Sequence, residues 1–257
     1  MRQIWPLYAI ASIGAFVALI AIAAAAEMGA RSKGYDIQKT GLTPRYPSNM
    51  SCSPLTSFYA SWDDVDGTRR DENHSGVDGG KLNDPIIAPA PGHVVALWRA
   101  NWGWGEEQAL LIKYTKPELK LGESDQDLIY YSEFDHLAIN EPINFSPGNL
   151  ITRGQTLATV SRPGGNKDYL PEVHWEVWEA PAHENLTWRQ NKAGGAYWTT
   201  PSARLVDPLY MMSLNAHVNE DLNVDIHPYL ATEDYSNFVG FTYILPCHYA
   251  RLATPEP

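Results

Sequence analysis

Clusters of lysine and arginine are missing from this chain, and their absence bears first on nucleic acids. The 257 residues contain 19 Lys and Arg against 30 Asp and Glu, which gives a formal net charge of −11 at pH 7. Binding a phosphate backbone needs grouped basic side chains. The composition therefore argues against nucleic acid as a partner and predicts a solvated acidic surface. A hydrophobic content of 44% is ordinary for a globular protein with a core.

Cysteine is also scarce. Only Cys52 and Cys247 occur, one before the main strand pattern begins and one near the chain end. In an oxidising compartment we expect a single bridge between them. It would fasten the C-terminal part to the start of the domain and contribute about 4 kcal/mol on the chain-entropy model. The alternative is two free buried thiols, which alkylation without reductant would detect.

One long apolar run is present, from Ile4 to Ala26. Its alanine-rich end resembles a signal-peptide cleavage region, while its length also suffices for an uncleaved anchor. Basic residues flank it on both sides and do not separate the two possibilities. We predict that residues 1–33 are a signal peptide or membrane anchor. Either places the remainder outside the cytoplasm, in the periplasm or cell envelope, secreted or anchored.

Short strand patterns separated by proline- and glycine-rich turns follow from about Leu55 onward. This spacing predicts a mainly β fold, an antiparallel β-sandwich or open barrel with a groove, besides the N-terminal apolar helix. We divide the chain into residues 1–33, a linker at 34–54, a domain at 55–209 and a mixed C-terminal extension at 210–257. The extension includes a β-like stretch, Phe238–Leu245, and no internal repeat is visible.

Aromatic residues are plentiful, with nine Trp and fourteen Tyr, as is usual for β proteins. Trp98, Trp102 and Trp104 could wall a groove and stack on sugar rings. Packing at the edge of the β domain is the preferred interpretation, and both alternatives stay open.

Residues 171–178 alternate apolar side chains with side chains that can bind a metal or transfer a proton. The alternation predicts a β-strand with one face in the core and one reactive face. Glu172, His174 and Glu176 would share the reactive face, with neighbouring side chains about 6.5 Å apart.

His74 and Asp78 lie four residues apart in a glycine-rich segment. Small residues such as Gly76 leave room for a ligand to approach the backbone. A set of two histidines and one aspartate leaves a fourth position open for water, as in catalytic zinc sites. Alone the pair is a weak signal, because a hydrogen-bonded loop histidine explains it more readily.

Five sequence blocks, taken in order, resemble those of the lysostaphin and LytM-type zinc metallopeptidases, which are peptidoglycan endopeptidases with a duplicated hybrid motif fold. The blocks are His74-Ser-Gly-Val-Asp78, Pro85-Ile-Ile-Ala-Pro-Ala-Pro-Gly92-His-Val94, Asp135-His136-Leu137, Gly154-Gln155 and Val173-His174-Trp-Glu176. The resemblance runs from about Leu55 to Leu209, where Val206-Asp207-Pro208-Leu209 looks like the family's usual domain ending.

This resemblance implies roles for individual residues. His74, Asp78 and His174 match the three ligands of a catalytic Zn²⁺. His136 matches a loop histidine that helps in proton transfer or stabilises the oxyanion. Asp135 is the sequence neighbour of His136 and a candidate to orient its ring. Neighbouring residues on a strand face opposite ways, so we do not favour this role for Asp135.

Glu172 departs from the family pattern, which usually has a histidine at this position. Strand alternation keeps Glu172 on the face of His174, and a carboxylate beside zinc serves as the base in other zinc hydrolases. Three alternatives remain: a working general base, an additional ligand or outer-shell group, and lost or reduced catalysis.

Two functions follow from this resemblance. The first is a zinc metalloendopeptidase that hydrolyses amide bonds of peptidoglycan stem peptides or cross-bridges, with Glu172 and His136 as its catalytic residues. The second is a catalytically weak or inactive regulator of other cell-wall hydrolases. The remaining histidines match no ligand pattern, and we expect them to form surface or core hydrogen bonds; they are His93, His183, His217, His227 and His248.

Overall fold

A computed structural model of the chain describes residues 36–37, 40–56, 58, 74–103, 105–122, 127–190, 195–216 and 218–250. The expected N-terminal helix, Trp104 and His217 lie outside these residues. Within the described residues, no helix combines the length and the apolar character needed to cross a membrane.

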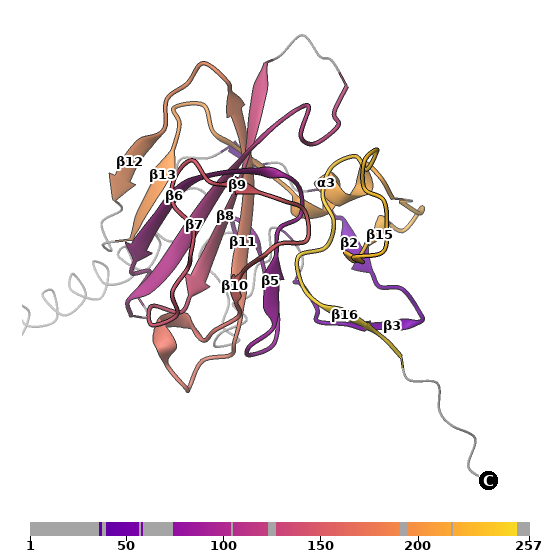
Figure 1. Cartoon of the computed structure of the whole chain (residues 1–257), viewed down its shortest axis with the longest axis horizontal. Coiled ribbons are helices and arrows are strands. Elements are labelled where there is room, and N and C mark those ends of the chain that lie inside the picture. Colours follow the sequence, from indigo (N-terminus) through magenta and orange to yellow (C-terminus); the bar gives the residue numbers. More distant parts are fainter. Residues whose placement is uncertain are drawn as a thin grey trace, which may run out of the picture.

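An eight-stranded sheet forms the centre of the molecule (Figure 1). Its order is β1 (Asp36–Ile37), β14 (Arg204–Val206), β11 (Val173–Pro181), β8 (Leu128–Leu137), β7 (Glu107–Thr115), β6 (Gly92–Ala100) and β9 (Leu150–Ile151), with β4 (Val77–Gly79) pairing with β11 beside this path. Neighbouring strands are antiparallel except β1 and β14.

Four two-stranded sheets complete the strand inventory of the described residues. They pair β5 (Pro85–Ile87) with β10 (Thr156–Thr159), β12 (Thr187–Gln190) with β13 (Ala196–Thr199), β2 (Thr43–Arg45) with β15 (Asn223–Asp225), and β3 (Met50–Cys52) with β16 (Cys247–Tyr249). The helical segments are η1 (Pro163–Gly165) and α3 (Pro208–Ser213). The prediction of a mainly β fold is confirmed, and these strands close no barrel.

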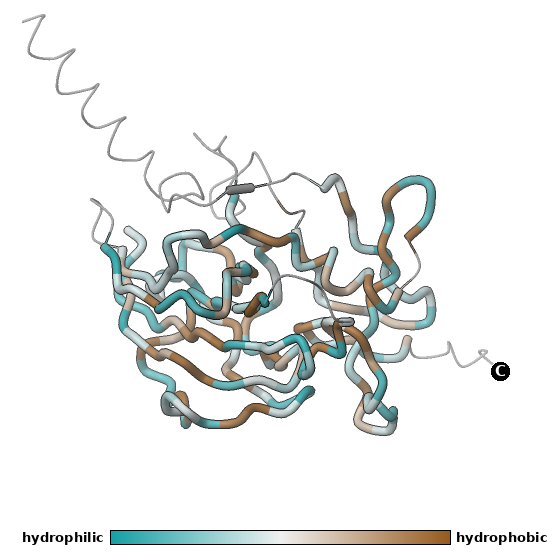
Figure 2. The backbone as a smooth tube through the Cα atoms, turned by 90° about the horizontal axis from the view of Figure 1, so that it is seen from above, coloured by the Kyte–Doolittle hydropathy of each residue, from teal (hydrophilic) through white to brown (hydrophobic). Residues whose placement is uncertain are grey.

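The core lies against the central strands. Trp175 of β11 is fully buried and stacks on Phe134 of β8, with ring centroids 6.1 Å apart and planes at 4°. Brown and teal stretches alternate along the strands in Figure 2, as expected when side chains alternate between apolar and polar surroundings. Of the tryptophans considered for a sugar-stacking groove, Trp98 and Trp102 are buried, so packing accounts for both.

The strand predicted at residues 171–178 is β11 (Val173–Pro181), and its polar face is buried as well as its core face. Every residue from Val173 to Ala180 is buried, including Glu176 at 0% exposure. The cause is position, since β11 lies inside the sheet with strands on both sides and is covered on both faces. The polar face of β11 therefore looks into a buried cluster, where charges need partners.

The two ends of the described chain meet. The strand pairs β2 with β15 and β3 with β16 lie together with α3 on one side of the large sheet (Figure 1). The predicted bridge between Cys52 and Cys247 is confirmed, and it joins residues 195 apart in sequence. The β-like stretch predicted at residues 238–245 forms no strand. It is irregular backbone with one isolated β-bridge, between Tyr243 and Pro228, and Phe241 to Leu245 are buried.

Candidate metal centre

The centre of the site is the pairing of β4 with β11. In this register His174 lies directly opposite Asp78. His74 lies three residues before the start of β4. Gly76, between His74 and β4, passes so close to β11 that an added Cβ would lie 2.4 Å from the carbonyl oxygen of Trp175. The small residue therefore permits the close approach that brings both ends of the His-x-x-x-Asp segment to His174.

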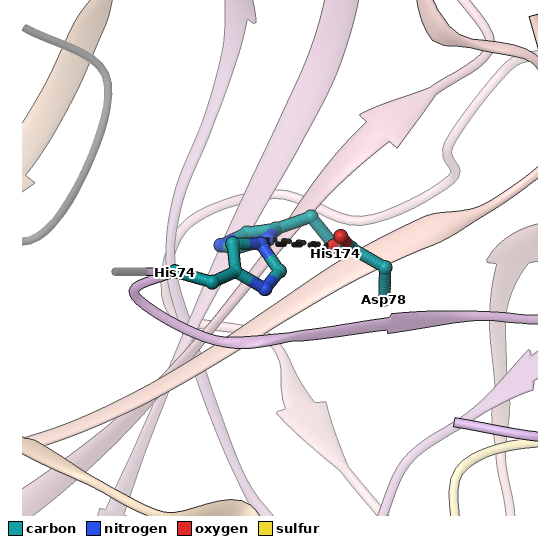
Figure 3. A group of neighbouring side chains, drawn as sticks. All are labelled: His74, Asp78 and His174. Carbon is teal, nitrogen blue, oxygen red and sulfur yellow. Dashed lines mark hydrogen bonds and ion pairs between the residues drawn. The ribbon is translucent and has the colours of Figure 1, made fainter. Parts of the chain in front are cut away.

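Three donor atoms converge in this place (Figure 3). Nδ1 of His174 lies 2.9 Å from Nε2 of His74 and 2.9 Å from Oδ1 of Asp78, and the last two atoms are 3.2 Å apart. Bond lengths of about 2.0–2.2 Å in a tetrahedral zinc site place ligand atoms about 3.3–3.5 Å from one another. The three atoms would need to separate by only a few tenths of an ångström, roughly, to hold Zn²⁺.

The electrostatics of the site also favour a cation. Burial favours the neutral form of Asp78, but His74 and His174 outweigh it and hold the pKa of Asp78 well below its usual range. Burial lowers the pKa of His174, whereas hydrogen bonds and charge from Asp78 and Glu176 raise it to about 10. Positive charge is thus stabilised between these side chains, as a divalent metal requires, and the donor set fits Zn²⁺.

The second nitrogen of His174 faces away from this centre. Nε2 lies 3.7 Å from Oε2 of Glu176 and 3.5 Å from Oγ of Ser75. A metal-binding histidine is commonly oriented by a carboxylate at its other nitrogen. Glu176, which sequence alternation had placed on the same face, is in position to orient the ring of His174 with Nδ1 toward the centre.

His136 lies near the end of β8 and beside the centre, with its ring centroid 6.1 Å from that of His174. Its φ of 62° is in the left-handed region, which interrupts the strand's alternation at this residue. Burial lowers the pKa of His136, but the charge and hydrogen bond of Glu107, followed by Glu172 and Asp135, raise it to about 9.

Glu172 completes the cluster from the segment just before β11. It is 4% exposed, and its Oε1 lies 3.9 Å from Nε2 of His136. Its backbone N–H donates to the carbonyl of Ser161, which fixes the segment. Glu172 and His136 therefore face each other, and the ring of His136 in turn lies next to that of His174.

Glu107 is the polar neighbour that the sequence pattern did not reveal. Its Oε2 lies 2.9 Å from Nδ1 of His136. Glu107 is therefore the carboxylate beside this ring, the position considered and not favoured for Asp135. Asp135 instead lies opposite His174 in the pairing of β8 with β11. Glu107 is the first residue of β7 and belongs to none of the sequence blocks that indicated the site. The register of β7 against β8 was needed to bring it to His136.

The histidines outside the site behave as expected where they are described. His93 pairs with Glu118 at 2.9 Å and His227 with Glu233 at 2.7 Å. His183 and His248 are exposed. None of these four lies in the group of residues that could hold a metal ion.

Solved structures that resemble part of the chain include lysostaphin. No protein-family model and no curated protein matches the chain. The catalytic domain of lysostaphin from Staphylococcus simulans is 20% identical over 48% of this chain and 78% of that domain, with a TM-score of 0.32. A zinc-containing peptidase from Vibrio cholerae is 24% identical over 53% of this chain and 36% of its own, with a TM-score of 0.32. The catalytic domain of a prophage-encoded M23 protein from Enterococcus faecalis is 19% identical over 61% and 93%, with a TM-score of 0.31. These TM-scores are too low to support a conclusion about function. Such a conclusion depends on the residues of the candidate site itself.

Proposed function

We propose that the chain is a zinc-dependent endopeptidase that hydrolyses amide bonds in the stem peptides or cross-bridges of peptidoglycan. The observation that carries the proposal is the convergence of His74, Asp78 and His174, with donor atoms 2.9–3.2 Å apart, beside His136 and Glu172. The peptidoglycan substrate comes from the resemblance of the five sequence blocks. The bridge between Cys52 and Cys247 supports an extracytoplasmic location, because such bridges persist in oxidising compartments.

His74, Asp78 and His174 would hold the metal and leave a fourth position for water or substrate. Bound there, Zn²⁺ would lower the pKa of water toward about 7 and polarise the scissile carbonyl. Glu172 and His136 then divide the proton transfers between them.

Glu172 is the better acceptor of the two. Its carboxylate accepts a proton from the attacking water, a role supported by its position opposite His136 and by the backbone bond to Ser161 that holds its segment. His136 is the better donor, because the neighbouring carboxylates raise its pKa to about 9 and keep its ring protonated near neutral pH. It stabilises the developing oxyanion or protonates the leaving amine through Nε2.

The second candidate is a catalytically weak or inactive regulator of other cell-wall hydrolases. One observation favours it: Glu172 stands where the related family usually has histidine, and it lies 3.9 Å from Nε2 of His136. A carboxylate engaged by this imidazolium could neutralise both proton-transfer groups instead of activating water.

The experiment combines zinc analysis with digestion. The chain without residues 1–33 is purified, its zinc content is measured, and it is incubated with peptidoglycan of several cross-bridge chemistries. We expect one zinc per chain and new amino termini in the peptides by mass spectrometry. One zinc without any product would favour the regulator, whereas no zinc at all would contradict the endopeptidase.

A further inference from the structure

Glu107 occupies a buried position at the start of β7 and contacts the side chain of His136. It is 2% exposed, and its Oε2 lies 2.9 Å from Nδ1 of His136. The backbone N–H of Gly164, in the η1 turn, donates to the same oxygen at 3.2 Å. Oε2 of Glu107 thus accepts two hydrogen bonds, one from the imidazole of His136 in β8 and one from the backbone of the η1 turn.

The loop before Glu107 is shaped to allow this contact. Gly105 has a φ of +131°, and a Cβ there would lie 3.0 Å from Cα of Gly164. A side chain at Gly105 would therefore push the turn away from the loop that carries Glu107. Two glycines in close approach hold the carboxylate between the loop and the turn.

The consequence for His136 lies in its two nitrogens. A carboxylate can only accept, so Nδ1 of His136 must carry the proton of the bond to Glu107. Nε2 is then the nitrogen that faces Glu172, at 3.9 Å. Without this partner, the neutral ring could place its proton on either nitrogen and could rotate about its side-chain bonds.

We propose that Glu107 is a positioning residue that fixes the ring orientation of His136 and holds a proton on Nδ1, so that Nε2 faces the substrate and is the nitrogen that gives up its proton. This inference rests on the role of His136 in the proposed function. Glu107 does not itself reach the three converging donor atoms through any contact described above, so its effect passes through His136.

A purely structural role is the competing interpretation, in which Glu107 only neutralises a buried histidine. Glu107→Gln separates the two. The N–H of Gly164 requires an acceptor at the position of Oε2, so the amide oxygen of the glutamine takes that place and still accepts from Nδ1 of His136. The variant keeps the orientation and removes the charge, whereas Glu107→Ala removes both.

The test reads the tautomer of the neutral His136 ring by nitrogen NMR of the zinc-loaded full chain labelled at histidine, at a pH above its pKa of about 9, with His136→Ala identifying the signals. We expect the proton on Nδ1 in the wild type and in Glu107→Gln, and a mixture that includes the Nε2 form in Glu107→Ala. Glu106→Gln is the matched control, because Glu106 is the adjacent residue and its side chain is exposed. It should match the wild type.

Hydrolysis is the second measurement. Glu107→Ala should lower kcat about 10- to 100-fold, the usual cost of removing such a supporting partner, with zinc content unchanged. Glu107→Gln should recover part of this loss. An unchanged tautomer in a folded Glu107→Ala variant would overturn the proposal. If Glu107→Ala does not fold, the Glu107→Gln variant decides instead. A His136 ring with its proton on Nε2 in that variant would also overturn the proposal.

The two proposals can fail separately. A zinc-loaded wild type that yields no peptidoglycan products would contradict the endopeptidase, yet the NMR tautomer would still decide whether Glu107 positions His136. Conversely, the wild type could hydrolyse peptidoglycan while folded Glu107→Ala shows the same His136 tautomer and the same hydrolysis rate. That result would support the proposed function and contradict the role of Glu107.

Discussion

The candidate metal centre is buried, whereas the C-terminal region, residues 210–250, is buried only in part, and the two are stabilised differently. The centre is built from neighbouring strands whose register places His174 opposite both Asp78 and Asp135. The C-terminal region is mostly irregular backbone held by a few long-range contacts. The guanidinium of Arg153, for example, lies 4.6 Å from the ring centroid of Phe238, and its Nη2 donates to the carbonyl of Gly240 at 3.0 Å.

This difference determines what each region can tolerate. In the centre, removing one member leaves other buried charges without compensation while the strands keep their pairing. In the C-terminal region the contacts join distant segments, and the covalent one, the bridge between Cys52 and Cys247, also restricts the unfolded chain, so its loss lowers stability without touching the centre. Changes in the first region should therefore alter chemistry, and changes in the second should alter stability.

The largest expected effect is on metal binding. His174→Ala removes the donor atom closest to both His74 and Asp78, so stoichiometric zinc binding should be lost. Zinc content after dialysis, measured by elemental analysis, checks this. His248→Ala in β16 is the matched control, because His248 is exposed and lies in the other region. Full zinc retention by His174→Ala would remove this residue from the ligand set.

A smaller effect is expected on the reaction alone. Glu172→Ala should leave zinc bound and lower the hydrolysis rate about 100- to 10,000-fold, the usual contribution of a proton-transfer group. The rate is measured on purified peptidoglycan by release of amino groups. Glu233→Ala, in the C-terminal region, should keep the wild-type rate, since Glu233 pairs with His227 on the surface. Equal turnover in wild type and Glu172→Ala would exclude this glutamate from the mechanism.

The contrast between the two regions also explains what the sequence could predict. The strand at residues 171–178 was readable because its alternation is local. The grouping of His74, Asp78 and His174 was expected from the resemblance of five sequence blocks to a known family. Their roles as metal ligands stay a prediction. The burial of both faces of β11 could not be read, since it depends on which elements cover the sheet.

Contacts between distant segments were the hardest to predict. The pairing of Cys52 with Cys247 was accessible only because no other cysteine competes. Glu107 was missed because the offset between β7 and β8, which has an irregularity near Gln108, decides which side chain meets His136. The domain boundaries stay a prediction, although residues 43–52 and 223–249 pair in two small sheets.

The bridge offers the strongest test of stability in the second region. Cys247→Ser should lower the free energy of unfolding by about 4 kcal/mol, because the loop of 195 residues is no longer closed in the unfolded chain. Denaturant unfolding measures the loss. Adding reductant should bring the wild type to the stability of the variant and leave the variant unchanged. Zinc content should stay the same, and its loss would show that the two regions are coupled.

Asp207 lies where the two regions meet, and it gives the smallest expected effect. It caps α3 by accepting from the backbone N–H of Leu209, it also accepts from the hydroxyl of Thr40, and it is 2% exposed. Burial raises the pKa of Asp207 to about 6, against the opposing effect of these hydrogen bonds. Between about pH 4 and 6 the folded chain thus holds a proton that the unfolded chain has released.

The sign of the pH dependence follows from that proton. The contribution of Asp207 to stability is fully present below about pH 4 and is lost as the pH rises through 6. Asp207→Asn keeps the cap and does not titrate, so from pH 4 to 7 the wild type should lose up to about 3 kcal/mol relative to this variant. Denaturant unfolding at several pH values measures the gap. Asp234→Asn, at an exposed site where hydrogen bonds from Ser236 lower the pKa of Asp234, should give a dependence of the opposite sign. The difference in the free energy of unfolding between wild type and Asp207→Asn could instead stay constant over this pH range. That result would show that the carboxyl group of Asp207 is ionised in the folded protein at all these pH values, and that its buried position tolerates a charge.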